Sequence, residues 1–272
     1  MKNLSLLFLA ISALVISSCS TDDIAPNNNE NANIKVLKKT IKYAPSEQNY
    51  ESKQIVHYNM NGEIVADSTF DATSNLISYI VRSSVGMTKY RKTYNAQNIL
   101  TFTDVYVYDN LDRLIETSGS RTATFVYNSD NTISQYNPNF SEVFNTYTVN
   151  ANGIINSVNE HYNNFTRHLE YEGLIPVKYL FDFGGVYTIE YYPNTMPSNL
   201  VKTPTELNNL ALATTAIESI AQSGNYYLKD FGGFWKNEIE FDSLNYITYS
   251  KSINVDDNQQ EHSSSEKYFY YY

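Results

Sequence analysis

A seven-residue pattern recurs along this chain and constrains its fold more than any other sequence feature. The pattern is an aromatic residue or Val, then Asp or Asn, two free positions, then Gly, Asn, Asp or Ser, one free position, and finally Ile or Leu. Copies begin at Tyr58, Phe70, Tyr94, Tyr108, Tyr127, Val149 and Phe241, and a looser copy begins at Tyr171 with Val177 in its last position. The repetition predicts one kind of local structure, used again and again.

Each copy has the residues of a β-hairpin loop. Asp or Asn is favoured at the start of a type I turn, because its side chain can accept a hydrogen bond from the backbone two residues on. The fifth pattern position then takes a left-handed conformation, which Gly, Asn and Asp tolerate best. The turn residues identified in this way are Asn59, Gly62, Asn95, Asp109, Asp112, Asn128, Asn150, Gly153 and Asp242.

A type I turn followed by one left-handed residue is a three-residue hairpin loop with a bulge, and it sets the first and seventh pattern positions opposite each other. Aromatic–aliphatic pairs of this kind contribute roughly 0.2–1 kcal/mol each. The pairs predicted most directly are Tyr58 with Ile64, Tyr94 with Leu100, and Tyr108 with Leu114. The segments between the loops are rich in β-branched and aromatic residues, which favours strands.

Two further turn signals interrupt the pattern. Asn163-Asn164 suits a two-residue turn that would place Glu160 opposite Arg167 as an exposed ion pair. The near-identical segments 179–185 and 227–233 both end in Gly-Gly, which predicts two equivalent hairpins on either side of the stretch between them.

That stretch contains the one strong helix signal. Thr203-Pro204-Thr205-Glu206 reads as a capping box with Pro at the first helical position, and apolar residues follow at helical spacing up to about 222. We expect a helix near 204–222 whose apolar stripe covers one end or face of the sheet. A plug or gate for a ligand cavity is the alternative.

The N-terminus has the features of an export signal. Met1-Lys2-Asn3 is a short, positively charged start, and an apolar run extends from Leu4 to Ile16. A helix needs about 20 apolar residues to span a bilayer, so this run fits the hydrophobic region of a secretory signal instead. Residues 20–33 are rich in Asn and lack apolar periodicity, which predicts a flexible linker.

Ile16-Ser17-Ser18-Cys19 resembles a bacterial lipobox, and Cys19 is the only cysteine. The resemblance implies a signal peptide over 1–18, lipidation of Cys19, and a tether over 19–33. A plain secretory signal with an incidental cysteine is the alternative. The run Ser20-Thr21-Asp22-Asp23 is similar to the export signal of Bacteroidota surface lipoproteins. It implies an outer-membrane lipoprotein, at the cell surface rather than on the periplasmic face.

The hairpin pattern itself resembles the tyrosine–aspartate repeats of the Rhs family. Residues 108–114 (Tyr-Asp-Asn-Leu-Asp-Arg-Leu) are the closest copy, and the resemblance covers about residues 55–160. Spacing here is uneven, and Asn or Asp usually replaces Gly. With the lipobox, the chain looks more like Bacteroidota lipoprotein domains of unknown function built from such repeats, some of which have a porin-like rolled sheet. That resemblance implies a fold and almost no activity.

Composition excludes several functions and leaves aromatic residues as the main lead. A net charge of −10 and a pI of 4.9 argue against nucleic-acid binding. One cysteine and four histidines without ligand spacing indicate no metal site, and we expect no cofactor and no catalytic constellation. Exposed aromatic rings suit glycan or peptide binding. The candidate ligand-binding residues are Trp235, Phe234, Tyr226 and Tyr227, although packing in the sheet interior is the favoured explanation for such residues.

The sequence thus predicts an all-β domain over 34–272, an antiparallel meander of hairpins rolled into a barrel-like or strongly curved sheet with a helical insertion at 203–223. The leading hypothesis for function is a non-enzymatic binding or structural component of the cell envelope, attached to the membrane through its lipid and contacting a glycan or an envelope protein. A glycan-processing hydrolase or glycan-binding surface lipoprotein is the alternative, and a hydrolase would need two carboxylates about 5–10 Å apart.

Overall fold

The computed structural model describes residues 37–44, 52–61, 63–138, 142–182, 184–193, 202–214, 216–217, 220, 226–244, 246–256 and 260–271. Every described residue belongs to the compact unit Ile34–Tyr272. The predicted signal peptide (1–18), Cys19, the tether (19–33) and the turn residue Gly62 all lie outside the described residues.

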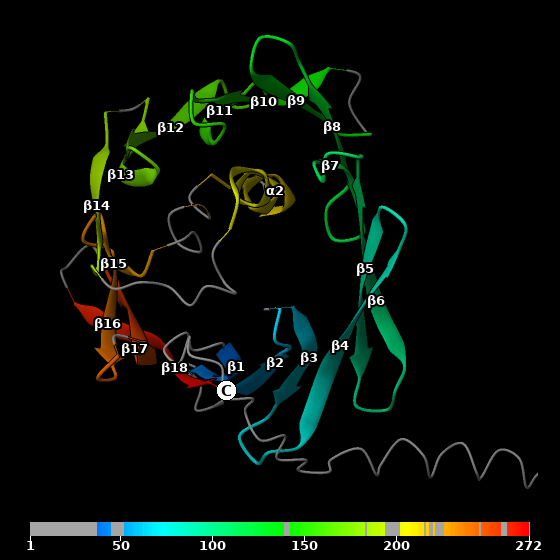
Figure 1. Cartoon of the computed structure of the whole chain (residues 1–272), viewed down its shortest axis with the longest axis vertical. Helices are drawn as coiled ribbons and strands as arrows, with labels where there is room; N and C mark the ends of the chain where they lie inside the picture. Colours follow the sequence, from blue (N-terminus) through cyan, green and yellow to red (C-terminus); the bar gives the residue numbers. More distant parts are fainter. Residues whose placement is uncertain are drawn as a thin grey trace, which may run out of the picture. The chain divides into compact units, whose positions relative to one another are not determined.

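The described residues form eighteen strands, and every pairing between them is antiparallel. Each strand pairs with the next in sequence, and β18 pairs with β1, so that the sheet closes into a barrel (Figure 1). The strands are β1 (Leu37–Ala44), β2 (Ser52–Tyr58), β3 (Ile64–Phe70), β4 (Leu76–Val85), β5 (Thr88–Asn95), β6 (Leu100–Tyr108), β7 (Leu114–Ser118), β8 (Ala123–Tyr127), β9 (Thr132–Tyr136), β10 (Val143–Val149), β11 (Ile155–Glu160), β12 (Phe165–Glu172), β13 (Ile175–Phe181), β14 (Val186–Tyr191), β15 (Leu228–Phe231), β16 (Trp235–Phe241), β17 (Ile247–Val255) and β18 (Glu261–Tyr271). The predicted rolled meander is therefore confirmed, and the sheet closes.

The hairpin loops adopt the predicted geometry. The first and seventh pattern positions are paired in all seven regular copies, including Tyr58 with Ile64, Tyr94 with Leu100, and Tyr108 with Leu114. The fifth position has a φ between 55° and 77° at Ser74, Asn98, Asp112, Asn131 and Gly153. The pattern therefore sets the register of seven hairpins directly from local sequence.

The acidic or amide residue of each loop holds the turn together. Asp109 Oδ1 accepts hydrogen bonds from the backbone N–H groups of Leu111 (2.9 Å) and Arg113 (3.0 Å). The same two bonds form in the turns led by Asn59, Asp71, Asn95, Asn150 and Asp242.

The turn led by Asn128 differs. Its backbone acceptor is Asp130, which accepts from Thr132 N–H at 3.1 Å, while the Asn128 amide donates to the Thr132 and Ser134 hydroxyls. This hairpin also keeps a regular register between Tyr127 and Ile133, without the shift seen in the other copies.

Ser74 offers a test of the left-handed position. Its φ is 66°, a conformation that costs an L-residue roughly 1–2 kcal/mol and costs glycine almost nothing. We expect Ser74→Gly to raise the free energy of unfolding by about 0.5–1 kcal/mol in urea denaturation. Ser83→Gly is the matched control. Ser83 lies within β4, where glycine is unfavourable, so this variant should lower the free energy of unfolding by about the same amount. Equal destabilisation by both variants would contradict the left-handed strain.

Two pairing predictions were wrong. The looser copy pairs Tyr171 with Pro176 instead of Val177. The β11–β12 connection uses four residues, 161–164, instead of two, so that Glu160 faces Phe165 and Arg167 faces Val158. The shift of two positions leaves side chains on their predicted faces, and Glu160 and Arg167 still form an ion pair across the diagonal. Their side chains are only 20% and 15% exposed, so the pair is not the exposed one we expected.

The helix is shorter than predicted. It is α2 (Pro204–Thr214), between β14 and β15, and it begins with the capping box: Thr203 N–H donates to Glu206 Oε2 at 2.6 Å, and Glu206 N–H donates to Thr203 Oγ1 at 3.3 Å. It ends at Thr214 because Ala216 N–H bonds back to the Ala211 carbonyl at 3.1 Å, the six-to-one bond of a helix C-terminus. Several residues of 215–225 lie outside the described part. As predicted, a Gly-Gly hairpin precedes and follows this excursion, as β13–β14 and β15–β16.

Candidate functional site

The helix lies inside the barrel rather than outside it (Figure 1). Its buried side chains include Leu207, Ala211 and Leu212, which pack against inward-facing residues of β7 to β15. Those residues include Leu114, Phe125, Ile133, Tyr147, Ile155, Val158, Leu169, Tyr179, Ile189, Leu228 and Phe231. The interior of this half of the barrel is therefore a filled apolar core. The helix α2 covers a face of the sheet, as expected, and that face is the inner one.

Two consecutive asparagines fix α2 to the hairpin loops. Asn209 Oδ1 accepts from Leu114 N–H at 2.8 Å, and its Nδ2 donates to the Asp112 carbonyl at 2.7 Å. Asn208 makes the same pair of bonds two hairpins further on, to Ile155 N–H (2.7 Å) and the Gly153 carbonyl (2.9 Å). Both amides thus bind the fifth and seventh positions of the repeated loop.

The opposite half of the interior carries charged and polar side chains among apolar ones such as Val56 and Ile80. Tyr106, Tyr108 and Leu114 contact the core, which identifies the inward face of β6 and β7. Because side chains alternate across a strand and registers are known, the same face continues through the positions of Asp104, Arg91, Arg82, Asp67 and Thr40. It reaches Lys42 and Lys267, which are direct partners on β1 and β18.

A row of hydrogen-bonded charges crosses this wall. Arg82 Nη2 contacts Asp67 Oδ2 at 2.9 Å, and Arg91 Nη1 contacts Asp104 Oδ2 at 3.2 Å. Both carboxylates are nearly inaccessible, with Asp67 5% and Asp104 2% exposed. The order along the row, from β3 to β6, is therefore negative, positive, positive, negative.

Each buried carboxylate has a second set of donors. Asp67 Oδ1 accepts from Gln54 Nε2 at 2.8 Å. Asp104 Oδ1 accepts from the backbone N–H of Ser120 at 3.0 Å and from its hydroxyl at 2.5 Å. The Ser120 contact needs Gly119 beside it, because a Cβ at Gly119 would stand 2.3 Å from the Thr103 carbonyl oxygen.

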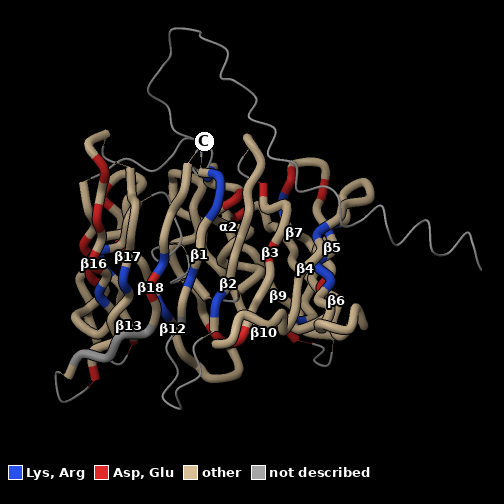
Figure 2. The backbone as a smooth tube through the Cα atoms, turned by 90° about the horizontal axis from the view of Figure 1, so that it is seen from below, with Lys and Arg blue, Asp and Glu red and all other residues tan. Residues whose placement is uncertain are grey.

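Three lysines add positive charge to the same inner wall. Lys89, which faces inward beside Tyr106, holds its Nζ 4.6 Å from the centre of the Tyr108 ring. Desolvation, together with the nearby charge of Lys42, lowers the pKa of Lys267 to about 8. The blue positions in Figure 2 mark Lys and Arg along β1, β2, β5 and β18.

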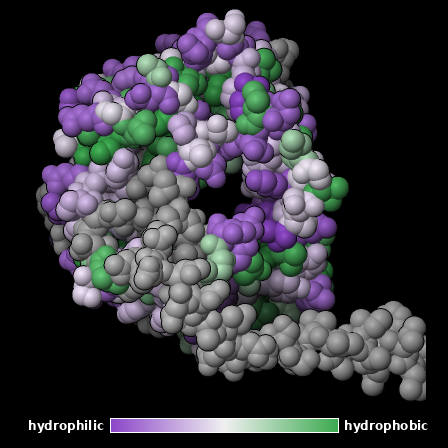
Figure 3. Space-filling view, viewed as in Figure 1, coloured by the Kyte–Doolittle hydropathy of each residue, from purple (hydrophilic) through white to green (hydrophobic). Residues whose placement is uncertain are grey.

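The space-filling view shows that α2 does not fill the ring. In Figure 3 an opening lies beside the helix, and the residues around it are mainly coloured hydrophilic. An opening thus lies beside α2, whereas the apolar wall of β7 to β15 packs against α2.

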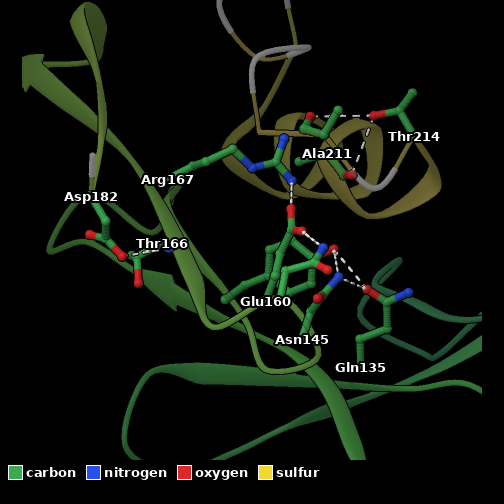
Figure 4. Close-up of polar contacts among 11 residues, drawn as sticks. Gln135, Asn145, Glu160, Thr166, Arg167, Asp182, Ala211 and Thr214 are labelled. Carbon is green, nitrogen blue, oxygen red and sulfur yellow. Dashed lines mark hydrogen bonds and ion pairs between the residues drawn. The ribbon is translucent and has the colours of Figure 1, made fainter. Parts of the chain in front are cut away.

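A buried polar cluster closes the core at one end of the filled half (Figure 4). Gln135 Oε1 accepts from Asn145 Nδ2 and from the Tyr147 hydroxyl, both at 2.8 Å. Burial raises the pKa of Tyr147 to about 12. Glu160 and Arg167 pair beside this cluster. These groups bond chiefly to one another, which suits a structural role, while the buried Asn145 Oδ1 has no hydrogen-bond partner among the described residues.

A small cavity of about 230 Å³ lies where the loops meet the start of α2. It is lined by residues that include Arg113, Tyr127, Asn131 and Asn208. The Arg113 guanidinium is 4.3 Å from the centre of the Tyr127 ring and also pairs with Asp109 at 2.6 Å. The cationic group is thus already engaged.

The four aromatic residues predicted to bind ligand do not form one platform. Phe234 lies in the β15–β16 turn, 40% exposed and edge-on to Tyr187 at 5.1 Å. Tyr226 and Tyr227 lie at the other end of β15, and Tyr227 is only 7% exposed. Trp235 packs against the core from β16. Their part in binding stays a prediction, while the inward charges of β3 to β6 are what sequence reasoning missed.

The lumenal carboxylates do not match a glycosidase pair. Asp67 and Asp104 are three strand spacings apart, about 14 Å, compared with the 5–10 Å that such enzymes need. Among the described residues, no group of three or more His, Cys, Asp or Glu side chains could hold a metal ion. Within the same residues, no helix has the length and apolar character to span a membrane.

Several solved structures are similar to this chain at low sequence identity. A porin-like protein from Bacteroides uniformis is 11% identical, with 87% of this chain and 98% of that chain covered and a TM-score of 0.47. TcdB2-TccC3-Cdc42 and TcdB2-TccC3 are 12% and 14% identical over 82% and 84% of this chain, each with a TM-score of 0.29. The chain spans only 14% and 15% of those two chains. No family model and no curated protein matches the sequence.

Proposed function

We propose that this protein is a lipid-anchored, non-enzymatic component of the outer membrane that binds a ligand in the polar half of its barrel. The observation that carries the proposal is the division of the interior. A protein with a purely structural role would need only a barrel whose interior is filled, and α2 with apolar side chains around it would be enough to fill it. Instead, one wall buries α2 while the other presents charged groups to an opening. A glycan is the ligand class we favour, with an envelope protein segment as the alternative.

The outward face of the filled half supports attachment by lipid rather than by insertion. Strands β8 and β9 have five residues each, whereas a membrane-spanning strand needs about 9–11 with apolar residues facing outward. Their outward positions include Thr124, Thr132 and Ser134. Acyl chains on Cys19 would supply the membrane affinity that this surface lacks. The acidic residues after Cys19 favour the cell surface over the periplasmic face.

Replacing the lipidation site tests the anchor. We expect Cys19→Ala, expressed in a bacterium that lipidates such signals, to abolish metabolic labelling with palmitate and to move the protein to the soluble fraction, because only the acyl chains hold it. Ser20→Ala is the matched control and should keep both properties. Palmitate labelling of Cys19→Ala, or its retention in carbonate-washed outer membranes, would contradict the proposal.

A further inference from the structure

Two arginines meet face to face on the open wall. Arg82 on β4 and Arg91 on β5 are direct partners across the strand pair and share the inward face. Like charges directly opposite each other destabilise a sheet. Their side chains are 31% and 43% exposed, so both are accessible on the inward face. The repulsion between these two arginines is therefore unfavourable unless another group compensates for it.

Their carboxylate neighbours do not use up the guanidinium donors. Arg82 contacts a single oxygen of Asp67, and Arg91 contacts a single oxygen of Asp104 and also hydrogen-bonds the Tyr106 side chain. The other oxygen of each carboxylate is bound by Gln54 or by Ser120. A guanidinium has five N–H donors in a fixed fork, so donors remain on both arginines while the acceptor atoms of the aspartates are engaged. An acceptor between the two positive groups could use these donors.

The surrounding charge favours an anion. Among the side chains that the structure describes, the inward positions of β18 and β1 to β6 carry the cations Lys42, Lys89, Lys267, Arg82 and Arg91 and the anions Asp67 and Asp104. The whole chain carries a net charge of −10, so this wall is opposite in sign to the molecule that holds it. Charges within about 8–10 Å dominate at physiological ionic strength, and local sign therefore decides what binds.

We propose that Arg82 and Arg91 together bind the carboxylate or phosphate group of a ligand in the barrel lumen. An anion placed over the pair turns the row into alternating charges, and two guanidiniums can each offer it paired N–H donors. Lys89 extends the site along β5. This assignment deepens the proposed lumen-binding function and rests on it, since it names the chemical class of the bound group.

Calorimetric titration of the full chain in detergent at low salt tests the assignment, with galacturonate and inorganic phosphate as separate probes. We expect at least one probe to bind, with affinity reduced about tenfold by Arg82→Gln or Arg91→Gln and lost in the double variant, because hydrogen bonds between charged groups are the strong ones. Binding of galacturonate alone indicates an acidic sugar, and binding of phosphate alone indicates a phosphate-bearing ligand. Lys178→Gln is the matched control: it removes a cation that pairs with Glu170 on the outer face and should leave binding unchanged.

The Arg82→Lys/Arg91→Lys variant keeps both charges if the glutamine variants fold poorly. It should bind more weakly than the native chain, because lysine lacks the paired donors, and its binding should fall steeply with added chloride. No binding of either probe by the native chain, or unchanged binding in a folded double variant, overturns the assignment. Binding of a neutral oligosaccharide with no anion binding would overturn it as well, and would leave the proposed lumen function standing.

Discussion

Raising the pH above about 10 should unfold this barrel abruptly. Burial raises the pKa of Tyr127, Tyr171, Tyr191 and Tyr227 well above the ordinary value of 10, and raises that of Tyr147 to about 12. Above pH 10 the unfolded chain releases these protons while the folded chain keeps them. The folded state then binds more protons, so the free energy of unfolding falls as the pH rises.

The size of the effect follows from linkage. Below pH 10 these tyrosines are protonated in both states and contribute no pH dependence. Between pH 10 and their folded pKa, each removes up to about 1.4 kcal/mol of stability per pH unit. Within one to two pH units, the stability lost through five such groups equals the roughly 5–15 kcal/mol by which an ordinary domain is stable. Lys267 and Lys202 have the opposite sign, because burial lowers their pKa values and stability then rises with pH towards 10.5, but they are two groups against five.

Circular dichroism and tyrosinate absorbance across an alkaline titration measure this transition. We expect loss of sheet signal and a jump in tyrosinate absorbance at the same pH. Tyr191→Phe should move the midpoint upward, since the Tyr191 hydroxyl is buried and has no hydrogen-bond partner among the described residues. Tyr162→Phe is the control, because Tyr162 is 77% exposed. Gradual ionisation near pH 10 with the sheet intact would contradict the expectation.

Removing the two asparagine amides of α2 should have the second large effect. Leu114 and Ile155 are fully buried, and their backbone N–H groups depend on Asn209 and Asn208 for acceptors. Leaving a buried donor unpaired costs about 1–3 kcal/mol. We therefore expect Asn208→Ala and Asn209→Ala each to lower the free energy of unfolding by about that amount, and the double variant to lower it further, though not additively, because both residues hold the same helix.

Urea denaturation gives the change in stability, and hydrogen exchange locates it. The amide protons of Leu114 and Ile155 should lose protection in the variant that lacks the corresponding asparagine, while protection in the core of β5 and β6 stays higher. Asn110→Ala is the matched control, an exposed substitution in the same hairpin loop that Asn209 binds. Native stability and protection in the double variant would show that α2 is held by its apolar side chains alone.

Interactions within a few residues of sequence explain part of this fold, and contacts between distant segments explain the rest. The seven hairpins were predictable, because turn type and register are decided within seven residues: Asp109, for example, binds Leu111 and Arg113 in its own loop. The turn at 161–164 was not, since its length is decided by how β11 and β12 pair over their full extent. The helix start was predictable from its capping box, while its end depends on a backbone bond from Ala216.

The sequence by itself determined that the chain folds back repeatedly into antiparallel hairpins and where each of them turns, because those interactions lie within a few residues. Only the tertiary structure decided that the sheet closes, that α2 enters the ring, and that Arg82 and Arg91 share one open wall. Closure joins β18 to β1, and Asn209 binds a loop almost a hundred residues earlier in the chain, so neither contact leaves a periodic trace in the sequence. Side chains alternate between the two faces of each strand. Which of the two faces points into the barrel depends on where the helix lies, and this is decided only when the barrel has assembled.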